Sequence, residues 1–163
     1  MPTVTHKSAI ISKLCSIEVS SRGSDTVIGP ASRIDDFVKI KHVGGVGHVI
    51  IGSNSHINSG SVIYSGNGVA IGNNVLIGPN CSITPTNHSF KDRDTLICEQ
   101  GFLESKGGII IENDVWVGSN VVILDGAVIR KGSVIGANSL VMGELPEYSI
   151  SFGSPAKVVS YRQ

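Results

Sequence analysis

An aliphatic residue recurs every six positions through much of the chain, and this period restricts the possible folds more than any other feature. Nine segments share it. Their leading residues are Ile51, Ile57, Ile71, Ile77, Ile111, Val117, Ile123, Ile129 and Ile135. Neither the two-residue period of a strand nor the 3.6-residue period of a helix explains such spacing. A fixed internal period indicates a repeat architecture.

The position three residues after each leader carries a second signal, because it is always Asn, Asp or Gly. The nine residues are Asn54, Gly60, Asn74, Asn80, Asp114, Asn120, Gly126, Gly132 and Asn138. These residue types adopt the left-handed backbone conformation at least cost, so each hexad should turn a sharp corner. Three hexads then close a triangular coil of about eighteen residues. We predict an all-β fold, a parallel β-helix of stacked coils.

Composition excludes several classes of protein. Thirteen Lys and Arg balance thirteen Asp and Glu in 163 residues, so net charge favours neither nucleic acid nor an anionic membrane as partner. Without a run of 18 apolar residues, we expect no integral membrane segment and a cytoplasmic location. Cys15, Cys81 and Cys98 lack paired spacing, which favours reduced thiols.

The hexads also predict the organisation of the chain, a single β-helix domain over residues 1–163. The predicted parts are irregular starting coils at 1–50, regular coils at 51–88 and 109–145, and a C-terminal tail at 146–163. The early coils should be irregular because the segments led by Ile28 and Ile34 keep the aliphatic residue but place Ala31 and Phe37 at the corner. Residues 1–27 give no readable pattern.

The longest break in the period predicts an extended loop at residues 89–108. Shorter breaks fall at 41–50, which contains the run VGGVGHV, and at 66–70. Insertions in a solenoid commonly carry function. A lone surface histidine is usually a solvated side chain, yet of five histidines His88 alone stands at the root of the loop. An imidazole there can act as a general base towards a hydroxyl group.

The segment ITPTNHSF, followed by the loop and GGIIIENDVWVGSNVVILDGAVI, resembles the hexapeptide-repeat acetyltransferase superfamily. The resemblance covers roughly residues 51–159 and is greatest to sugar, maltose and galactoside O-acetyltransferases. It implies left-handed coils, acetyl-CoA as co-substrate without a required metal, and a homotrimer with sites between subunits. It also implies that His88 is the catalytic base for direct acetyl transfer, in a ternary complex, to a hydroxyl of a sugar or cell-surface glycan precursor.

The same resemblance suggests further site residues. Asn58 and Trp116 match acceptor-binding positions. Each also has a structural explanation, since Asn58 fits an ordinary hexad and the Trp116 side chain could simply cover a coil corner. The coenzyme A positions are Ser119, near the thioester, and Ala137, Ala156 and Lys157. Two departures stand against the pattern: Met142 and Gly143 replace an expected basic residue, and Tyr64, Ser65 and Gly66 replace expected acidic ones.

Other functions remain open at this point. An N-acetyltransferase acting on an amino sugar nucleotide would depend less on a base, and a non-catalytic scaffold would use the same repeats. A γ-class carbonic anhydrase would need three zinc-binding histidines, whereas His88 has no histidine close by. The acid that orients His88 is equally open among Asp92, Asp94, Glu99, Glu104 and Glu112. Cys81 falls on an inward position and reads as structural.

Overall fold

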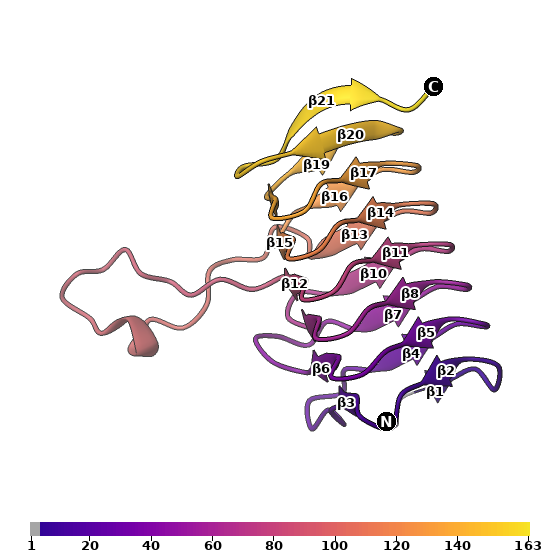
Figure 1. The fold of residues 1–163 in the computed structure, drawn as a ribbon. Helices are drawn as coiled ribbons and strands as arrows, with labels where there is room; N and C mark the ends of the chain where they lie inside the picture. The colour runs from indigo at the N-terminus through magenta and orange to yellow at the C-terminus, as the bar shows by residue number, and fades with distance from the viewer. Residues whose placement is uncertain (1–3) are drawn as a thin grey trace.

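The computed structural model describes residues 4–163, and these form a left-handed parallel β-helix. Three sheets make the faces of a triangular prism whose coils stack along one axis, with the two termini at opposite ends (Figure 1). We name the faces sheets A, B and C, and the edges between them the A–B, B–C and C–A corners. The chain passes through the faces in that order in every coil, so equivalent residues of successive coils lie in columns.

The strands are short and are distributed regularly over the faces. Sheet A contains β1 (Val4–Thr5), β4 (Thr26–Ile28), β7 (Val49–Ile51), β10 (Val69–Ile71), β13 (Ile109–Ile111), β16 (Val128–Ile129) and β19 (Glu144–Leu145). Sheet B contains β2 (Ile10–Ile11), β5 (Arg33–Ile34), β8 (His56–Ile57), β11 (Leu76–Ile77), β14 (Trp116–Val117), β17 (Val134–Ile135), β20 (Ser149–Phe152) and β21 (Lys157–Tyr161). Sheet C contains β3 (Ser16–Ile17), β6 (Lys39–Lys41), β9 (Val62–Tyr64), β12 (Ser82–Thr84), β15 (Val122–Leu124) and β18 (Leu140–Val141).

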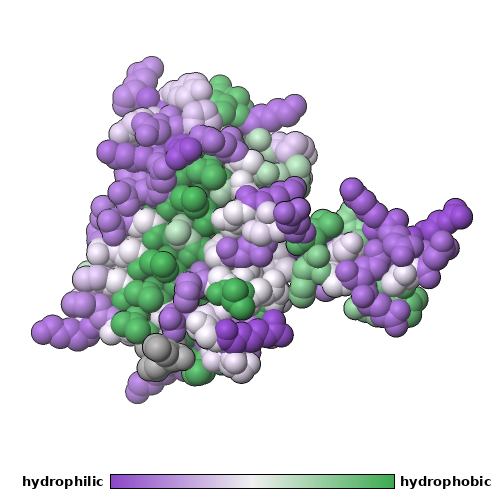
Figure 2. Space-filling model, turned by 180° about the vertical axis from the view of Figure 1, so that it is seen from behind, coloured by the Kyte–Doolittle hydropathy of each residue, from purple (hydrophilic) through white to green (hydrophobic). Residues whose placement is uncertain are grey.

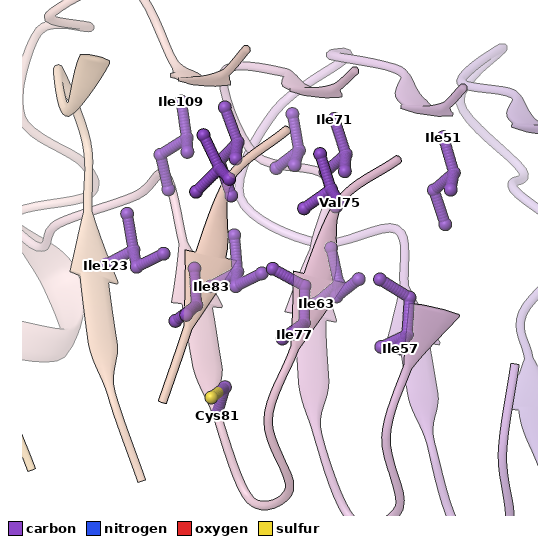
Figure 3. Packing of buried hydrophobic residues seen from close by; sticks show 14 of the residues in the cluster. Ile51, Ile57, Ile63, Ile71, Val75, Ile77, Cys81, Ile83, Ile109 and Ile123 are labelled. Carbon is purple, nitrogen blue, oxygen red and sulfur yellow. The ribbon is translucent and has the colours of Figure 1, made fainter. Parts of the chain in front are cut away.

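The leading aliphatic residues fill the prism. All nine are at most 2% exposed, and Figure 3 shows several of them pointing into one continuous core. In sheet B, for example, Ile57 pairs in register with Ile77, and Ile77 with Val117. Full burial of each such side chain contributes about 1.5–3 kcal/mol. The core is therefore a set of columns, in which each coil is stabilised by its neighbours.

The predicted corners are confirmed, since all nine residues have positive φ. The early coils differ from the prediction. Ala31 and Phe37 also adopt the left-handed conformation, at φ 55° and 61°, and β4 to β6 pair in register with β7 to β9. Stacking explains this, because ladder hydrogen bonds such as Asn54 N–H to Pro30 O, at 2.8 Å, hold the corner whatever its side chain. The strands and the two sharp corners of these coils are thus regular, whereas the C–A connections from β3 to β4 and from β6 to β7 are longer than that from β15 to β16.

Replacing Asn80 tests how much a corner side chain contributes to stability. Asn80 has φ 58°, and an alanine there should lower the free energy of unfolding by about 1 kcal/mol because its Cβ strains the left-handed backbone without the compensating amide. Thermal and urea unfolding measure the loss. Asn80→Gly is the matched control, since glycine adopts positive φ freely; an equal loss in both variants would contradict the explanation.

The predicted loop is present and projects far from the prism (Figure 1). It leaves at the C–A corner after β12, includes the short 3₁₀ helix η1 (Ile97–Glu99), and returns to β13. At the C-terminal end β21 folds back antiparallel onto β20 and covers the last coil of sheet B. Among residues 4–163, no helix has the length and apolarity needed to cross a bilayer.

Candidate active site

His88 lies at the mouth of a cleft at the C–A corner. It forms an isolated antiparallel bridge with Phe102, on the returning limb of the loop, and the two ring centroids are 4.7 Å apart. The cleft has a volume of about 390 Å³. Its lining residues are Val43, Gly44, Tyr64, Thr84, Thr86, His88 and Phe102. None of them carries a fixed charge, and Tyr64 and Phe102 add aromatic rings beside the imidazole, which suits a neutral ligand with apolar faces.

Glycines shape the floor of this cleft. A Cβ on Gly44 would lie 2.5 Å from Thr86 Cγ2, and Gly66 is in equally close contact with Thr86, so two glycines admit the Thr86 side chain. Gly44 also has φ +75°, which suits no other residue so well. Thr86 Oγ1 is buried without a hydrogen-bond partner among the described residues.

None of the five candidate acids orients His88 within the described part of the chain. No hydrogen bond or ion pair there joins them to the imidazole, whose ring packs on Phe102 instead. Glu112 is bound elsewhere, since Arg130 Nη1 donates to it at 2.9 Å and this hydrogen bond lowers the pKa of Glu112. Asp92 is also engaged, because its Oδ2 accepts the Thr95 hydroxyl at 2.7 Å.

A second recess, which we call the groove, lies at the B–C corner and has a volume of about 420 Å³. Its lining residues are Asn58, Gly78, Pro79, Trp116, Gly118, Ser119, Val134, Ile135, Gly136, Ala137 and Phe152. The structure thus brings together four of the predicted site residues, Asn58, Trp116, Ser119 and Ala137. Trp116 is 56% exposed, whereas the Asn58 amide already donates to Ile77 O at 2.7 Å.

Backbone donors are the chemically useful feature of the groove. At the hexad position two residues after the leading aliphatic residue, the N–H groups of Ser53, Asn73 and Lys131 donate to side chains of the adjacent coil. Those of Ser119 and Ala137, like that of Ser59, have no acceptor within residues 4–163, and only Ser119 and Ala137 line the groove. These two residues occupy the same hexad position in successive coils. In the coil before them this position is Pro79, which has no N–H. Unpaired N–H groups in a recess can stabilise developing negative charge on an acyl oxygen.

The remaining predicted coenzyme residues lie outside both recesses. Ala156 packs against the core, and its N–H donates to Leu140 O at 2.8 Å. Lys157 begins β21 and is exposed. Phe152 was not predicted from the sequence; its ring covers Gly136 so closely that any side chain at Gly136 would collide with it. Tyr64 and Phe102 were also not predicted as lining residues, although Tyr64 lies at a departure from the family pattern and Phe102 in the longest break of the repeat.

The other reactive side chains have structural partners. His42 is buried, with Nε2 3.1 Å from Thr26 Oγ1, and His48 Nδ1 accepts the Asp25 N–H at 3.0 Å. No cluster of three His, Cys, Asp or Glu suitable for a metal ion occurs in the part of the chain that the structure describes. Burial raises the pKa of the Cys81 thiol, whose Sγ donates to Gly118 O at 3.2 Å. Cys81 is therefore a core residue.

Comparisons with known proteins agree with this architecture. The family described as bacterial transferase hexapeptide (six repeats) matches residues 108–143, and the hexapeptide repeat of succinyl-transferase matches 68–87. WbbJ of Escherichia coli K12, named as a lipopolysaccharide biosynthesis O-acetyl transferase, is 35% identical over 143 residues, which are 84% of this chain and 69% of WbbJ. The chain belongs to the hexapeptide-repeat transferase family.

Two further proteins show the range of the family. A protein of Mycobacterium tuberculosis named as an acetyltransferase is 40% identical over 77 residues, 47% of this chain but only 25% of that protein. A variant of AntD, an N-acyltransferase from Bacillus cereus crystallised with dTDP-4-amino-4,6-dideoxyglucose and coenzyme A, has a TM-score of 0.81 at 27% identity. That similarity covers 99% of this chain and 84% of AntD.

Proposed function

We propose that the protein is an acetyl-CoA-dependent O-acetyltransferase that acts on a hydroxyl of a sugar or glycan precursor. The observation that carries this proposal is the pair of complementary recesses: an uncharged, aromatic-lined cleft with an imidazole at its mouth, and a groove with unpaired N–H groups. One recess suits an acceptor with a base, and the other suits a thioester with its oxyanion donors.

Acetyl transfer by this site then needs one general base and one set of N–H donors for the oxyanion. His88 removes the proton of the acceptor hydroxyl as its oxygen attacks the thioester carbonyl carbon. The Ser119 N–H donates to the oxyanion of the tetrahedral intermediate. When the carbon–sulfur bond breaks, the imidazolium returns the proton to the departing thiolate, so that free coenzyme A and neutral His88 result. No acyl-enzyme is required, and in this proposal Lys157, which is exposed at the start of β21, binds a phosphate of the coenzyme.

A homotrimer would complete the site, because the cleft and the groove of one chain lie at different corners of the prism. Sheet A offers a contact surface: Val4, Val27, Ile50, Ala70, Ile110 and Val128 pair in register along its outer face. Ile50 and Ile110 are more than 40% exposed. Figure 2 shows exposed apolar side chains gathered in a band along the solenoid. A band of this kind marks a protein–protein contact, here with a second copy of the chain.

Mixed oligomers test the shared site. His88→Ala chains and Ser119→Pro chains should each be inactive alone, whereas co-expressed chains should recover about one quarter of the parent activity, because random assortment places an intact cleft beside an intact groove at that frequency. Thiol release from acetyl-CoA measures the recovery. The control is a mixture of the two separately purified oligomers, which do not exchange subunits and should therefore stay inactive. Mixed oligomers with no recovered activity would contradict a site built from two subunits.

A second candidate, N-acylation of an amino sugar nucleotide, is favoured by the similarity to AntD and by Lys41. Lys41 pairs in register with Tyr64 on the same outward row, so a cation stands beside the cleft and could meet a phosphate of the acceptor. Thiol release against sugars, amino sugars and their nucleotide forms separates the candidates. Hydroxyl-dependent release supports the O-acetyltransferase, amine-dependent release supports the alternative, and no release with any acceptor would contradict both.

A further inference from the structure

Asp125 is a buried acid that the proposed chemistry does not use. It follows β15 at the C–A corner and is 4% exposed. Within residues 4–163 no Lys, Arg or His forms an ion pair with it, so N–H donors alone stabilise its carboxylate. Burying a carboxylate without a cation costs stability unless its oxygens are well hydrogen-bonded. A buried carboxylate of this kind is therefore expected to fix the position of the chain segments whose N–H groups bond to it.

The partners of Asp125 are the returning root of the long loop and Asn67, which lies at the C–A corner before the loop. Oδ2 accepts the Lys106 N–H at 2.8 Å and Oδ1 accepts the Gly108 N–H at 3.0 Å, so the carboxylate holds the returning limb. Oδ2 also accepts the Asn67 side-chain amide at 3.1 Å. The Asn67 backbone N–H in turn donates to Pro85 O, at 3.2 Å, on the outgoing limb. Asn67 and Asp125 belong to the coils on either side of the loop.

These contacts reach His88 through the paired limbs. The Leu103 N–H donates to Asn87 O at 2.8 Å, and the Ser89 N–H to Gly101 O at 3.0 Å. His88 and Phe102 pair between these two bonds. Each limb is therefore fixed at its root, and the limbs are joined to each other at the base. We propose that Asp125, with Asn67, is the positioning residue that holds His88 and Phe102 over the acceptor cleft.

Hydrogen exchange tests the anchor on the full-length protein without any acceptor. Asp125→Asn and Asp125→Ala should speed exchange across residues 85–108, above all at the amides of Lys106 and Gly108, while sheets A, B and C keep their protection. Asn67→Ala gives a milder version, because it removes the side-chain amide that bonds to Asp125 but keeps the Asn67 backbone N–H bond to Pro85 O and the two bonds of Asp125 to the returning limb. Asp114→Asn is the matched control, since asparagine already occupies that corner position in other coils. Parent-like exchange in all the Asp125 and Asn67 variants would overturn the anchor.

Kinetics test whether the anchor positions the base, an inference that rests on the proposed function. Misplacing a catalytic group by about 1 Å costs on the order of 10²-fold in rate, so kcat with acceptor should fall by that factor in Asp125→Asn. The affinity for acetyl-CoA should stay unchanged, because the groove lies at another corner. Parallel loss of acetyl-CoA binding and kcat would overturn the positioning role. A parent protein that acetylates no acceptor would defeat the proposed function, while the exchange result would still decide the anchor.

Discussion

His88→Ala should lower kcat for acetyl transfer to a hydroxyl acceptor by about 10²- to 10⁴-fold, the usual contribution of a general base. The affinity for acetyl-CoA, measured by calorimetry, should match that of the parent because the groove lies at another corner of the prism and His88 does not line it. The side chain is exposed at its cleft and makes no hydrogen bond within the described residues, so the fold should lose little stability. Thiol release under saturating acetyl-CoA gives the rate.

His6→Ala is the matched control for this variant. His6 is exposed in the first coil, at the N-terminal end of the stack and away from the cleft, and bonds only to Ser8, at 2.8 Å, so its loss should leave the rate unchanged. A His88→Ala enzyme that retains most of its activity towards a hydroxyl would contradict the role of base. Retained activity towards an amine alone would favour the N-acyltransferase.

Ser119→Pro should lower kcat by about 10²- to 10³-fold, the cost of removing one oxyanion donor. Proline deletes the N–H without adding a charge. The equivalent position one coil earlier is already Pro79, preceded by Gly78 as Ser119 is preceded by Gly118, so the corner accepts the ring. Steady-state kinetics should show most of the loss in kcat, because the donor acts on the transition state more than on bound acetyl-CoA.

Ser59→Pro provides the control for the proline substitution. Ser59 occupies the same hexad position at the same corner, its N–H also lacks an acceptor within residues 4–163, and it lies outside the groove. The Ser59→Pro variant should have the same stability to unfolding as Ser119→Pro but the kcat of the parent. Equal losses in the two variants would show that the proline disturbs the coil, and equal kcat in Ser119→Pro and the parent would remove the N–H from the mechanism.

The fold was largely predictable because its determinants are local. Asn and Asp, as at Asn54 and Asp114, adopt the left-handed conformation at lower cost than other residues with a side chain, and six-residue spacing then stacks the corners. Ala31 and Phe37 show the limit, since ladder hydrogen bonds from neighbouring coils impose the same conformation on residues that would not choose it. Stacking is a tertiary effect, and reading one hexad at a time misses it.

The candidate site was predictable only in part for a similar reason. Ser119 and Ala137 occupy equivalent hexad positions, so the repeat itself places them one above the other in the groove. Phe102 reaches His88 only because the loop doubles back, and no period in the sequence encodes that direction. Asp125 reads as an ordinary third residue of its hexad, like Ser53 or Lys131. Its role depends on donors that lie 17 to 58 residues away in the chain.

The register of sheet A continues undisturbed past the long loop. Val69 pairs with Ile109, and Ile71 with Ile111, as though the intervening excursion did not exist. A segment that leaves and rejoins a ladder without shifting it can change in length or composition with little penalty to the coils, because loop closure entropy grows slowly with length. If the proposed function holds, the loop that lines the acceptor cleft can therefore change during evolution while the coils that form the groove stay the same.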